Sequence, residues 1–323
     1  MNKLSVMVFR RLTADVEERL KREFNVIALS AEGNRSKSRI LELTARCDAL
    51  CPSVVDKIDG EMIREAGGHL RIIANFGVGY DNIDLQAARN AGVIVTNTPG
   101  VLTEATADIA MTLILMAARR AGEGERLIRN GCWTGWEPDQ LLGHDVTGKT
   151  LGLVGFGRIG EAVARRAYHG FRMNIAIYNR SAVNAQRLSE LNAVQYATLQ
   201  ELLSNSDFIS LHCPSTPDTH NLINQSAFRL MKRTAILINT ARGDIVDEQA
   251  LVEALNNKVI AAAGLDVYAR EPGITKELPA MENVVLLPHL GSATYETRSA
   301  MGMRMIDNLM DYFAGREPRD RVI

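Results

Sequence analysis

Three ionisable residues in the last third of the chain each follow an apolar run that reads as a β-strand: Arg242, Glu271 and His289. An arginine holds a carboxylate through two parallel hydrogen bonds. An imidazole, whose ordinary pKa is about 6.5, exchanges a proton near neutral pH. A carboxylate bonded to the far ring nitrogen orients the imidazole and favours its charged form. Beside a nicotinamide that supplies a hydride, these groups could reduce a 2-keto acid.

Each of the three residues also has an ordinary structural alternative. Arg242 could be a surface arginine, Glu271 a turn residue before a proline, and His289 a cap at the start of the last helix. Their spacing alone leaves these alternatives open. The catalytic interpretation therefore needs a cofactor site elsewhere in the chain.

A glycine fingerprint between a strand and a helix predicts that cofactor site. The run Gly155-Phe156-Gly157-Arg158-Ile159-Gly160 follows an apolar strand at 150–154, and a second strand at 174–178 comes after the helix. Gly155 permits the tight turn, Gly157 lets the backbone approach a pyrophosphate, and Gly160 lets the helix pack close to the strand. The N–H groups and dipole at the helix start then hold the anion. The glycines alone could be a structural turn or a chance match, but this context favours a dinucleotide.

The residues after the second strand favour NADP(H) over NAD(H). The fingerprint predicts an acidic residue there, as acceptor for the ribose 2′-hydroxyl, but the chain has Asn179, Arg180 and Ser181. No carboxylate repels a 2′-phosphate, Arg180 can pair with it, and Ser181 can donate a hydrogen bond. NAD(H) is expected to bind more weakly. An exposed strand-end arginine without a ligand is the alternative for Arg180.

Strands and helices alternate along the chain, which indicates an α/β protein with doubly wound parallel sheets. Before the fingerprint, strands are expected at 4–8, 25–29, 48–51, 70–74 and 93–96, with helices at 14–23, 60–66 and 84–90. After it, strands are expected at 208–212, 235–239, 260–264 and 284–287. Helices are expected at 199–203 and 225–231, from the cap at Asp247 through residue 255, and, as a long helix, at 293–314. A glycine-rich turn at 75–82 could hold a substrate carboxylate with its N–H groups, although an ordinary turn is the simpler interpretation.

The segment 103–120 reads as a helix that is apolar almost all round, so it is expected to be buried between domains or against a second subunit. Both tryptophans follow, at Trp133 and Trp136. Exposed tryptophans often anchor interfaces, and packing in the chain's own core is the alternative.

The composition excludes several classes of protein. The formal net charge of −1 provides no field for nucleic acid or an anionic membrane. The longest apolar stretch, 109–118, is short for a membrane span, and the first residues read as a strand rather than a signal peptide. The four cysteines form no C-x-x-C pair or Cys/His cluster, so neither a metal site nor a disulfide framework is indicated. A cytoplasmic protein with reduced thiols is expected.

The chain resembles the D-isomer-specific 2-hydroxyacid dehydrogenase family, and within it the glyoxylate/hydroxypyruvate reductases. The resemblance covers almost the whole chain, in the segments 75–84, 96–120, 155–160, 211–214, 239–247, 264–272 and 287–298. The runs Pro288-His289-Leu290-Gly291-Ser292-Ala293-Thr294 and Trp133-Thr134-Gly135-Trp136 look most like the glyoxylate/hydroxypyruvate branch. The family's usual acidic residue after the second strand is missing.

The resemblance implies that Arg242, Glu271 and His289 are catalytic, with His289 as the acid/base. It implies substrate contacts at Val78, Gly79, Arg242, His289 and Ser292, and a homodimer in which the partner subunit's Trp136 reaches the substrate and helix 103–120 lies at the interface. It further implies cofactor contacts at Arg158, Ile159, Cys213, Thr240, Asp266 and Gly291. The other expected cofactor contacts are Gly155, Gly157, Gly160, Asn179, Arg180, Ser181, Pro214, Ala241, Arg242 and His289.

The expected architecture is a Rossmann domain for NADP, residues 99–288, inserted in a flavodoxin-like substrate domain, residues 1–98 and 289–323. The active site is expected in the cleft between them, where closure excludes water. The expected reaction is NADPH-dependent reduction of glyoxylate or hydroxypyruvate to glycolate or D-glycerate. One alternative is reduction of a larger 2-keto acid, such as 2-ketogluconate or a branched or aromatic one. The other is a dinucleotide-sensing interaction module without turnover.

Overall fold

The computed structural model describes residues 3–29 and 36–323. The chain divides into two compact units: unit 1 comprises residues 1–102 and 293–323, and unit 2 comprises residues 103–292. Unit 2 is therefore inserted in unit 1. The junctions lie four residues after the expected ones at 98/99 and 288/289.

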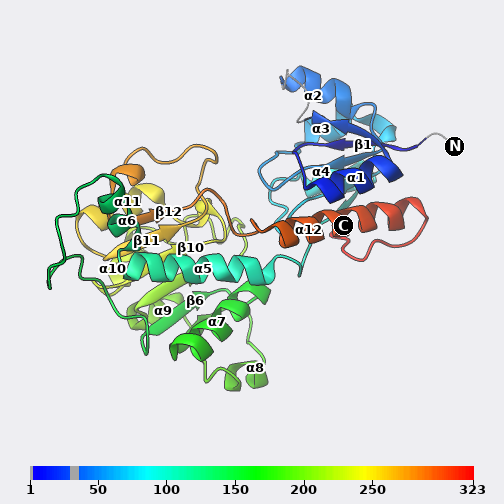
Figure 1. The fold of residues 1–323 in the computed structure, drawn as a ribbon. Coiled ribbons are helices and arrows are strands. Elements are labelled where there is room, and N and C mark those ends of the chain that lie inside the picture. The colour runs from blue at the N-terminus through cyan, green and yellow to red at the C-terminus, as the bar shows by residue number, and fades with distance from the viewer. Residues whose placement is uncertain (1–2, 30–35) are drawn as a thin grey trace. The chain divides into compact units, whose positions relative to one another are not determined.

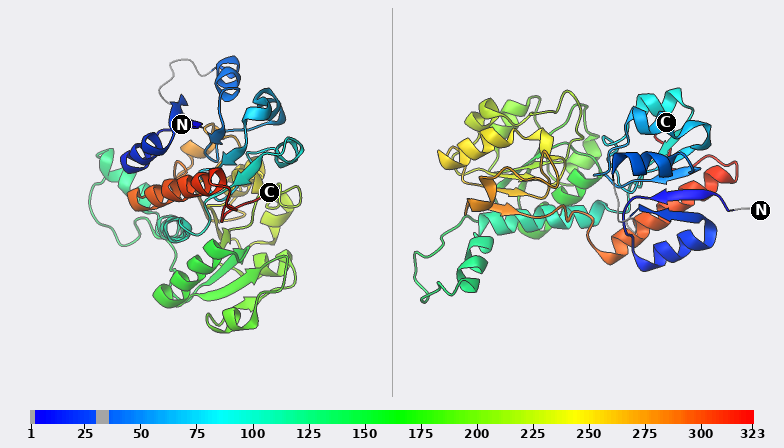
Figure 2. Two further views of the ribbon diagram at one scale, coloured as in Figure 1. Left: turned by 90° about the vertical axis from the view of Figure 1, so that its right-hand side faces the viewer. Right: turned by 90° about the horizontal axis from the view of Figure 1, so that it is seen from above.

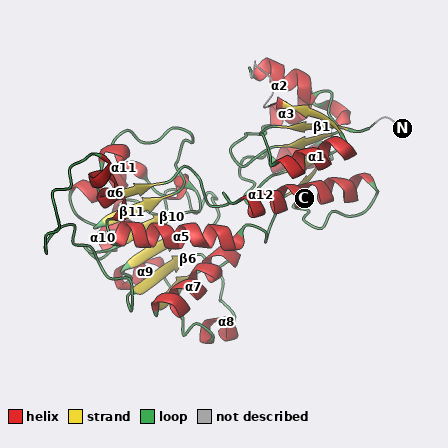
Figure 3. Cartoon of the chain, viewed as in Figure 1, coloured by secondary structure: helices red, strands yellow, loops and turns green. Residues whose placement is uncertain are grey.

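Unit 1 contains a parallel sheet of five described strands in the order β2-β1-β3-β4-β5, which is the flavodoxin-like order. The strands are β1 (Ser5–Val8), β2 (Asn25–Ala28), β3 (Ala49–Cys51), β4 (Ile72–Ala74) and β5 (Ile94–Thr96). The helices are α1 (Ala14–Glu23), α2 (Lys37–Thr44), α3 (Gly60–Glu65), the 3-10 turn η2 (Gly67–His69), α4 (Leu85–Asn90) and α12 (Tyr295–Phe313). Helices cover both faces of the strands, as Figure 3 shows.

The two faces of the unit 1 sheet bury separate apolar clusters. On one face, side chains such as Leu43 of α2 and Ile63 of α3 pack with Leu50 of the sheet. On the other, Leu20 of α1 and Ile306 of α12 share a cluster with the sheet. Helix α12 runs beside α1 although nearly the whole chain separates them in sequence (Figure 1). The core of unit 1 therefore needs both ends of the described chain.

Unit 2 contains a parallel sheet of seven described strands in the order β12-β11-β10-β9-β6-β7-β8, the doubly wound order of a Rossmann fold. The strands are β6 (Thr150–Val154), β7 (Asn174–Tyr178), β8 (Val194–Gln195), β9 (Phe208–Leu211), β10 (Ile236–Asn239), β11 (Ala262–Leu265) and β12 (Val284–Leu286). The order reverses between β6 and β9. Ligands bind such sheets beyond the carboxyl ends of the strands at that point.

The helices of unit 2 lie on both faces of this sheet. They are α5 (Thr103–Ala118), α6 (Ala121–Arg129), α7 (Arg158–Phe171), α8 (Ala185–Ser189), α9 (Leu199–Asn205), α10 (Gln225–Leu230), α11 (Glu248–Asn256) and the 3-10 turns η3 (Gly243–Ile245) and η4 (Leu278–Ala280). Helices α5 and α7 share one apolar cluster with the sheet, whereas α9, α10 and α11 share the other. The core is thus built on both faces, as expected for parallel strands.

Helix α5 corrects one expectation. Leu113 and Ile114 are fully buried against β10, β11 and α7 of unit 2 itself, whereas Ile109, Leu115 and Met116 are half-buried. The face that carries Leu113 and Ile114 is therefore covered within unit 2, not by another domain or a second subunit. The helix also ends at Ala118 rather than at residue 120, where Arg120 takes a left-handed conformation with φ 52°.

Besides the 3-10 turns, three helices and one strand were not expected from the sequence: α2, α6, α8 and β8. Helix α6 and the irregular segment after it extend away from the sheet of unit 2 (Figure 2). This segment carries both tryptophans, and Trp133 is 51% and Trp136 76% exposed. The alternative that they pack in the chain's own core is therefore wrong.

Candidate active site

His289 lies in a left-handed turn just beyond the carboxyl end of β12, with φ 55°. Its backbone N–H donates to the Asp266 carbonyl at 2.9 Å, which joins the turn to the end of β11. The Asp266 carboxylate accepts the N–H groups of Leu290 at 2.6 Å and Gly291 at 2.8 Å. These hydrogen bonds between two neighbouring strand ends fix the backbone that carries the imidazole.

Glu271 holds one nitrogen of this imidazole. Its Oε2 lies 2.7 Å from Nδ1 of His289, and its Oε1 accepts the N–H of Tyr268 at 3.0 Å. Burial raises the pKa of Glu271, but the hydrogen bond with His289, the charge of His289, the Tyr268 N–H and the Arg242 guanidinium together bring it below its ordinary value. Glu271 is therefore an ionised carboxylate that orients the ring, and the other ring nitrogen, Nε2, could exchange a proton.

Arg242 follows the end of β10 and is near enough to Glu271 for its charge to lower the carboxyl pKa. The backbone beneath it is fixed by Asn239, whose side chain donates to the Arg242 carbonyl at 2.7 Å and accepts the Ala241 N–H at 3.0 Å. Three adjacent strands, β10, β11 and β12, therefore bring Arg242, Glu271 and His289 to one edge of the sheet.

Two of the structural alternatives, those for Arg242 and His289, are wrong. Arg242 is half-buried rather than a surface residue. Glu271 bonds the imidazole, and the last helix is capped by Thr294, which accepts the Thr297 N–H at 3.0 Å, and not by His289.

The glycine fingerprint forms a turn with room for an anion. Gly155 has φ 95°, and a Cβ on it would lie 2.7 Å from the backbone nitrogen of Cys213. A Cβ on Gly160 would overlap the Gly155 carbonyl oxygen, so only glycine permits this approach of helix and turn. Around Gly157, which caps α7, no heavy atom lies within 4 Å of where a Cβ would be. Open space therefore remains before the first N–H groups of α7, where a pyrophosphate could bind.

The end of β7 carries an amide where a carboxylate would select NAD. Asn179 Oδ1 accepts the Phe156 N–H at 3.2 Å, and Asn179 Nδ2 donates to the Ser181 carbonyl at 3.0 Å and hydroxyl at 3.2 Å. Asn179 thereby ties the glycine turn to the segment after β7. Arg180 is exposed beside it. This edge presents a guanidinium, a hydroxyl and an amide to a ribose substituent.

Two further buried polar groups lie at the same ends of the strands. Burial raises the pKa of Asp266, whereas the Leu290 and Gly291 N–H groups and the charge of His289 act in the opposite direction. The hydroxyl of Thr240, after β10, is buried and has no hydrogen-bond partner among the described residues. An unsatisfied buried hydroxyl costs free energy, which a bound ligand can remove.

The pair Ser210 and His212, on β9 and just after it, was missed by the sequence-based reasoning. The Ser210 hydroxyl lies 2.8 Å from Nε2 of His212, and the Cβ of His212 approaches the Gly160 position beneath the glycine turn. Burial lowers the pKa of His212 to about 4, so the ring is neutral near pH 7. The sequence signal for this pair was a serine on the strand two positions before a histidine at the strand end.

The remaining predicted positions are also placed. Burial raises the pKa of the Cys213 thiol to about 11, so this cysteine is a neutral thiol beside Gly155. Pro214 and Arg158 are exposed, Ile159 and Ser292 are half-buried, and Gly291 lies near Thr106 of α5.

In unit 1, Val78 and Gly79 lie in the turn after β4. Asn97 Nδ2 donates to the Val78 carbonyl at 2.8 Å, and Asn75 Nδ2 donates to the Gly79 carbonyl at 2.7 Å. The N–H groups of Val78 and Gly79 have no acceptor among residues 3–29 and 36–323. The carbonyls are therefore held by the protein, whereas the two donors are available to an anion.

Within the described ranges, no group of three or more His, Cys, Asp or Glu side chains is arranged to hold a metal ion. The helices of that part of the chain include none with the length and apolar character to cross a membrane.

The chain is similar to known proteins over nearly its whole length. The family model described as D-isomer specific 2-hydroxyacid dehydrogenase, NAD binding domain, matches residues 111–291. A glyoxylate reductase from Korarchaeum cryptofilum is 46% identical over 320 residues, which cover 98% of this chain and 95% of that protein. A solved structure of a protein from Thermus thermophilus is 43% identical, with a TM-score of 0.91, and 99% of this chain and 100% of that one are covered.

A second solved structure carries ligands. It is an NADPH-dependent glyoxylate/hydroxypyruvate reductase from Sinorhizobium meliloti in complex with NADP and malonate. It is 34% identical to this chain, the TM-score is 0.87, and the match covers 99% of this chain and 97% of that one.

Proposed function

Because this chain belongs to the D-isomer-specific 2-hydroxyacid dehydrogenase family and is an oxidoreductase with an NAD(P)-binding domain, we propose that it reduces glyoxylate or hydroxypyruvate to glycolate or D-glycerate with NADPH. The observation that carries the proposal is the pair of Glu271 and His289, joined at 2.7 Å beside Arg242. A protein that only sensed a dinucleotide would have no use for an oriented proton donor.

The proposed chemistry assigns one task to each of these side chains. When bound, the reduced nicotinamide supplies the hydride that goes to C2 of the keto acid. Arg242 holds the substrate carboxylate and carbonyl oxygen and polarises the ketone. His289 gives the proton on Nε2 to the oxygen of C2, while Glu271 keeps the ring oriented and stabilises its charged form. The products are the 2-hydroxy acid and the oxidised cofactor.

We assign the second contact with the substrate carboxylate to the N–H groups of Val78 and Gly79, with Ser292 as a further polar contact. This assignment is supported by the two N–H groups, which have no acceptor among the described residues, whereas the carbonyls of Val78 and Gly79 are already bonded. Two backbone N–H groups can donate hydrogen bonds to a carboxylate, so no second arginine is needed to hold it.

Cofactor binding is proposed at the turn of Gly155, Gly157 and Gly160 and at the strand ends around it. The space at Gly157 and the unpaired Thr240 hydroxyl support this site. The other proposed contacts are Arg158, Ile159, Cys213, Pro214, Ala241, Arg242, Asp266, His289 and Gly291.

NADPH is proposed over NADH because Asn179, Arg180 and Ser181 present no carboxylate to the 2′-phosphate. Asn179 is engaged with Phe156 and Ser181, which leaves the exposed Arg180 as the charged group for the phosphate. NADH is expected to serve with lower affinity.

A homodimer in the cytoplasm is proposed, in which the partner subunit's Trp136 contributes to the substrate site and α5 lies at the interface. The 76% exposure of Trp136, on a segment that extends from unit 2, supports this (Figure 2). Covering so exposed an indole with another surface lowers the free energy and so favours association.

The test is the initial rate of NADPH oxidation, with NADH in parallel, for glyoxylate, hydroxypyruvate, pyruvate, phenylpyruvate and 2-ketogluconate. Fast turnover of the two small acids with NADPH is the expected result. Preference for a bulky acid would keep the mechanism and replace the substrate. NADPH binding without turnover of any acid would instead favour the sensing module.

A further inference from the structure

A salt bridge between Arg10 and Asp56 lies at the carboxyl edge of the unit 1 sheet. Arg10, just after β1, donates from Nε to Asp56 Oδ1 at 2.8 Å and Oδ2 at 3.1 Å, and from a terminal nitrogen to Oδ1 at 2.5 Å. The Asp56 side chain is 8% exposed and that of Arg10 45%. Such a fork fixes a carboxylate in both position and plane.

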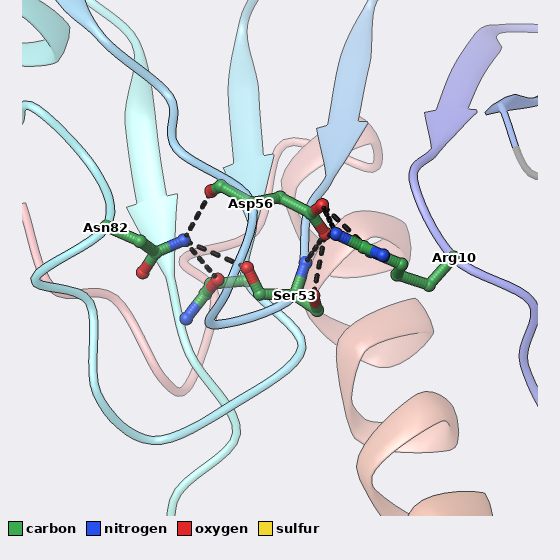
Figure 4. Close-up of polar contacts among 5 residues, drawn as sticks. Arg10, Ser53, Asp56 and Asn82 are labelled. Carbon is green, nitrogen blue, oxygen red and sulfur yellow. Dashed lines mark hydrogen bonds and ion pairs between the residues drawn. The ribbon is translucent and has the colours of Figure 1, made fainter. Parts of the chain in front are cut away.

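The same carboxylate closes a tight turn. Asp56 Oδ2 accepts the backbone N–H of Ser53 at 3.0 Å and its hydroxyl at 2.6 Å, and the Asp56 N–H donates to the Ser53 carbonyl at 3.0 Å (Figure 4). The turn 53–56 is therefore held by a carboxylate that itself needs the guanidinium. A buried carboxylate deprived of this partner would be costly to keep in place.

Asn82 connects this turn to the turn after β4. Its Nδ2 donates to the carbonyls of Ser53 and Asp56, both at 3.0 Å, and lies 3.4 Å from Oδ1 of Asn75 (Figure 4). Asn75 in turn holds the Gly79 carbonyl at 2.7 Å.

The two turns also touch directly. The Phe76 N–H donates to the Pro52 carbonyl at 2.8 Å, and a Cβ on Gly77 would overlap Cγ1 of Val54. A shift of the turn 53–56 therefore has to move the segment 76–79.

We propose that Arg10 is a positioning residue for keto-acid binding: by holding Asp56, and through it the turn 53–56, Asn82 and Asn75, it sets the orientation of the Val78 and Gly79 N–H groups. The inference deepens the proposed function and depends on it for the identity of the bound anion. Arg10 touches no reacting atom in this scheme. Its effect is on the affinity for the substrate, not on the chemical step.

The chain offers a matched control. Arg71 pairs with Asp48 at 2.7 Å, with side-chain exposures of 43% and 27%. Both residues precede strands, β4 and β3, so this pair lies at the amino edge of the same sheet. Arg71→Ala thus removes a similar ion pair of unit 1 without reaching the turn of Val78.

The experiment measures KM, kcat and NADPH affinity of Arg10→Ala, Arg10→Lys and Arg71→Ala, together with hydrogen–deuterium exchange. For Arg10→Ala we expect KM for the keto acid to rise about tenfold or more, because loss of the charge-assisted contact with Asp56 releases the turn that orients the Val78 and Gly79 N–H groups. Both kcat and NADPH affinity should stay near wild type. Arg10→Lys should recover part of the KM, and Arg71→Ala should leave it unchanged.

Exchange supplies a readout that does not need turnover. Peptides covering 52–57 and 75–82 should take up deuterium faster in Arg10→Ala than in wild type, and the same peptides should be unaffected in Arg71→Ala. If wild type reduced no keto acid, the proposed function would fail, while this exchange result would still decide whether Arg10 orders the turn.

Unchanged KM and exchange in a folded Arg10→Ala would overturn the inference, as would an equal rise of KM in Arg71→Ala. Should Arg10→Ala not fold, Ser53→Ala takes its place. This variant removes the hydroxyl that bonds Asp56 at 2.6 Å and keeps the ion pair, and the same two readouts apply to it.

Discussion

Nδ1 of His289 and Oε2 of Glu271 lie 2.7 Å apart although 18 residues separate them, and the imidazole is carried on a left-handed backbone with φ 55°. The turn is held at that geometry by Asp266, which bonds three successive backbone N–H groups from His289 to Gly291. Glu271 thus engages Nδ1 of the ring and leaves Nε2 without a bond to its carboxylate.

The first prediction concerns the proton donor. His289→Ala should lower kcat for keto-acid reduction by about 10²- to 10⁴-fold, the usual contribution of general acid catalysis. NADPH affinity, measured by fluorescence titration, should be nearly unchanged because the glycine turn is intact. A variant as active as wild type would remove the role of His289.

The second prediction concerns Glu271. Glu271→Gln keeps the shape and removes the charge, so kcat should fall about tenfold to a hundredfold while the fold is retained. The matched control is Glu248→Gln, because Glu248 bonds the Ala269 N–H at 2.8 Å and Thr275 in the same loop and is not bonded to His289. Equal losses in the two variants would show that only the loop matters.

Glu271 should also make the stability of unit 2 sensitive to acid. Its folded pKa lies below the ordinary value of 4.5, so its contribution is complete above pH 4.5 and is lost as the pH falls through the folded pKa. The difference in unfolding free energy between wild type and Glu271→Gln should shrink over that range. Denaturant titrations at about pH 7, 5 and 3.5 provide the comparison.

The third prediction concerns cofactor choice. The double variant Asn179→Asp, Arg180→Ala introduces a carboxylate for the 2′-hydroxyl and removes the cation for the 2′-phosphate. The ratio of kcat/KM for NADPH to that for NADH should fall about tenfold or more. Arg229→Ala, at an exposed position of α10, controls for the loss of a surface charge. Retention of the wild-type NADPH preference would contradict the assignment.

The fourth prediction concerns His212. Its folded pKa of about 4 lies below the ordinary 6.5, so the unfolded chain binds a proton more readily between these values. Stability should rise with pH across this window by at most about 1.4 kcal/mol per unit, an upper bound because the ring is half-buried. His212→Asn should flatten the slope, whereas His169→Asn, on exposed His169, should not. An unaltered slope in His212→Asn would refute the assignment.

The fifth prediction concerns the proposed dimer. Trp136→Ala should raise KM for the keto acid several-fold and weaken self-association in sedimentation, with unchanged circular dichroism, since the indole is 76% exposed and supports no core. Leu230→Ala, which removes another exposed apolar side chain, on α10, is the control. A monomeric wild type would disprove the arrangement.

Much of this fold can be predicted from sequence because its signals are local. Buried parallel strands are short apolar runs, so β6 and β10 lie within a residue of their expected bounds. The turn at Gly155 is as expected because its glycines are required by contacts inside one strand, turn and helix. The ends of β10, β11 and β12 likewise bring Arg242, Glu271 and His289 to one edge of the sheet.

What sequence could not supply depends on contacts between distant residues. Arg10 and Asp56 are 46 positions apart, and neither belongs to a recognisable motif. The sequence did not show that unit 2 itself covers the face of α5 with Leu113 and Ile114, because an apolar face does not reveal which surface covers it. Strand β8 was missed because two residues at a sheet edge carry too little pattern.

The division of the chain also has a consequence for its biosynthesis. Unit 2 is continuous, so a ribosome that has released residue 292 has delivered every strand and helix of the Rossmann sheet. Unit 1 has its five described strands much earlier, yet the face on which α1 packs stays only partly covered until Met305, Ile306 and Leu309 of α12 emerge. The first sheet to be translated is therefore the last to be completed, and its exposed face is where a nascent-chain chaperone would bind in the interval.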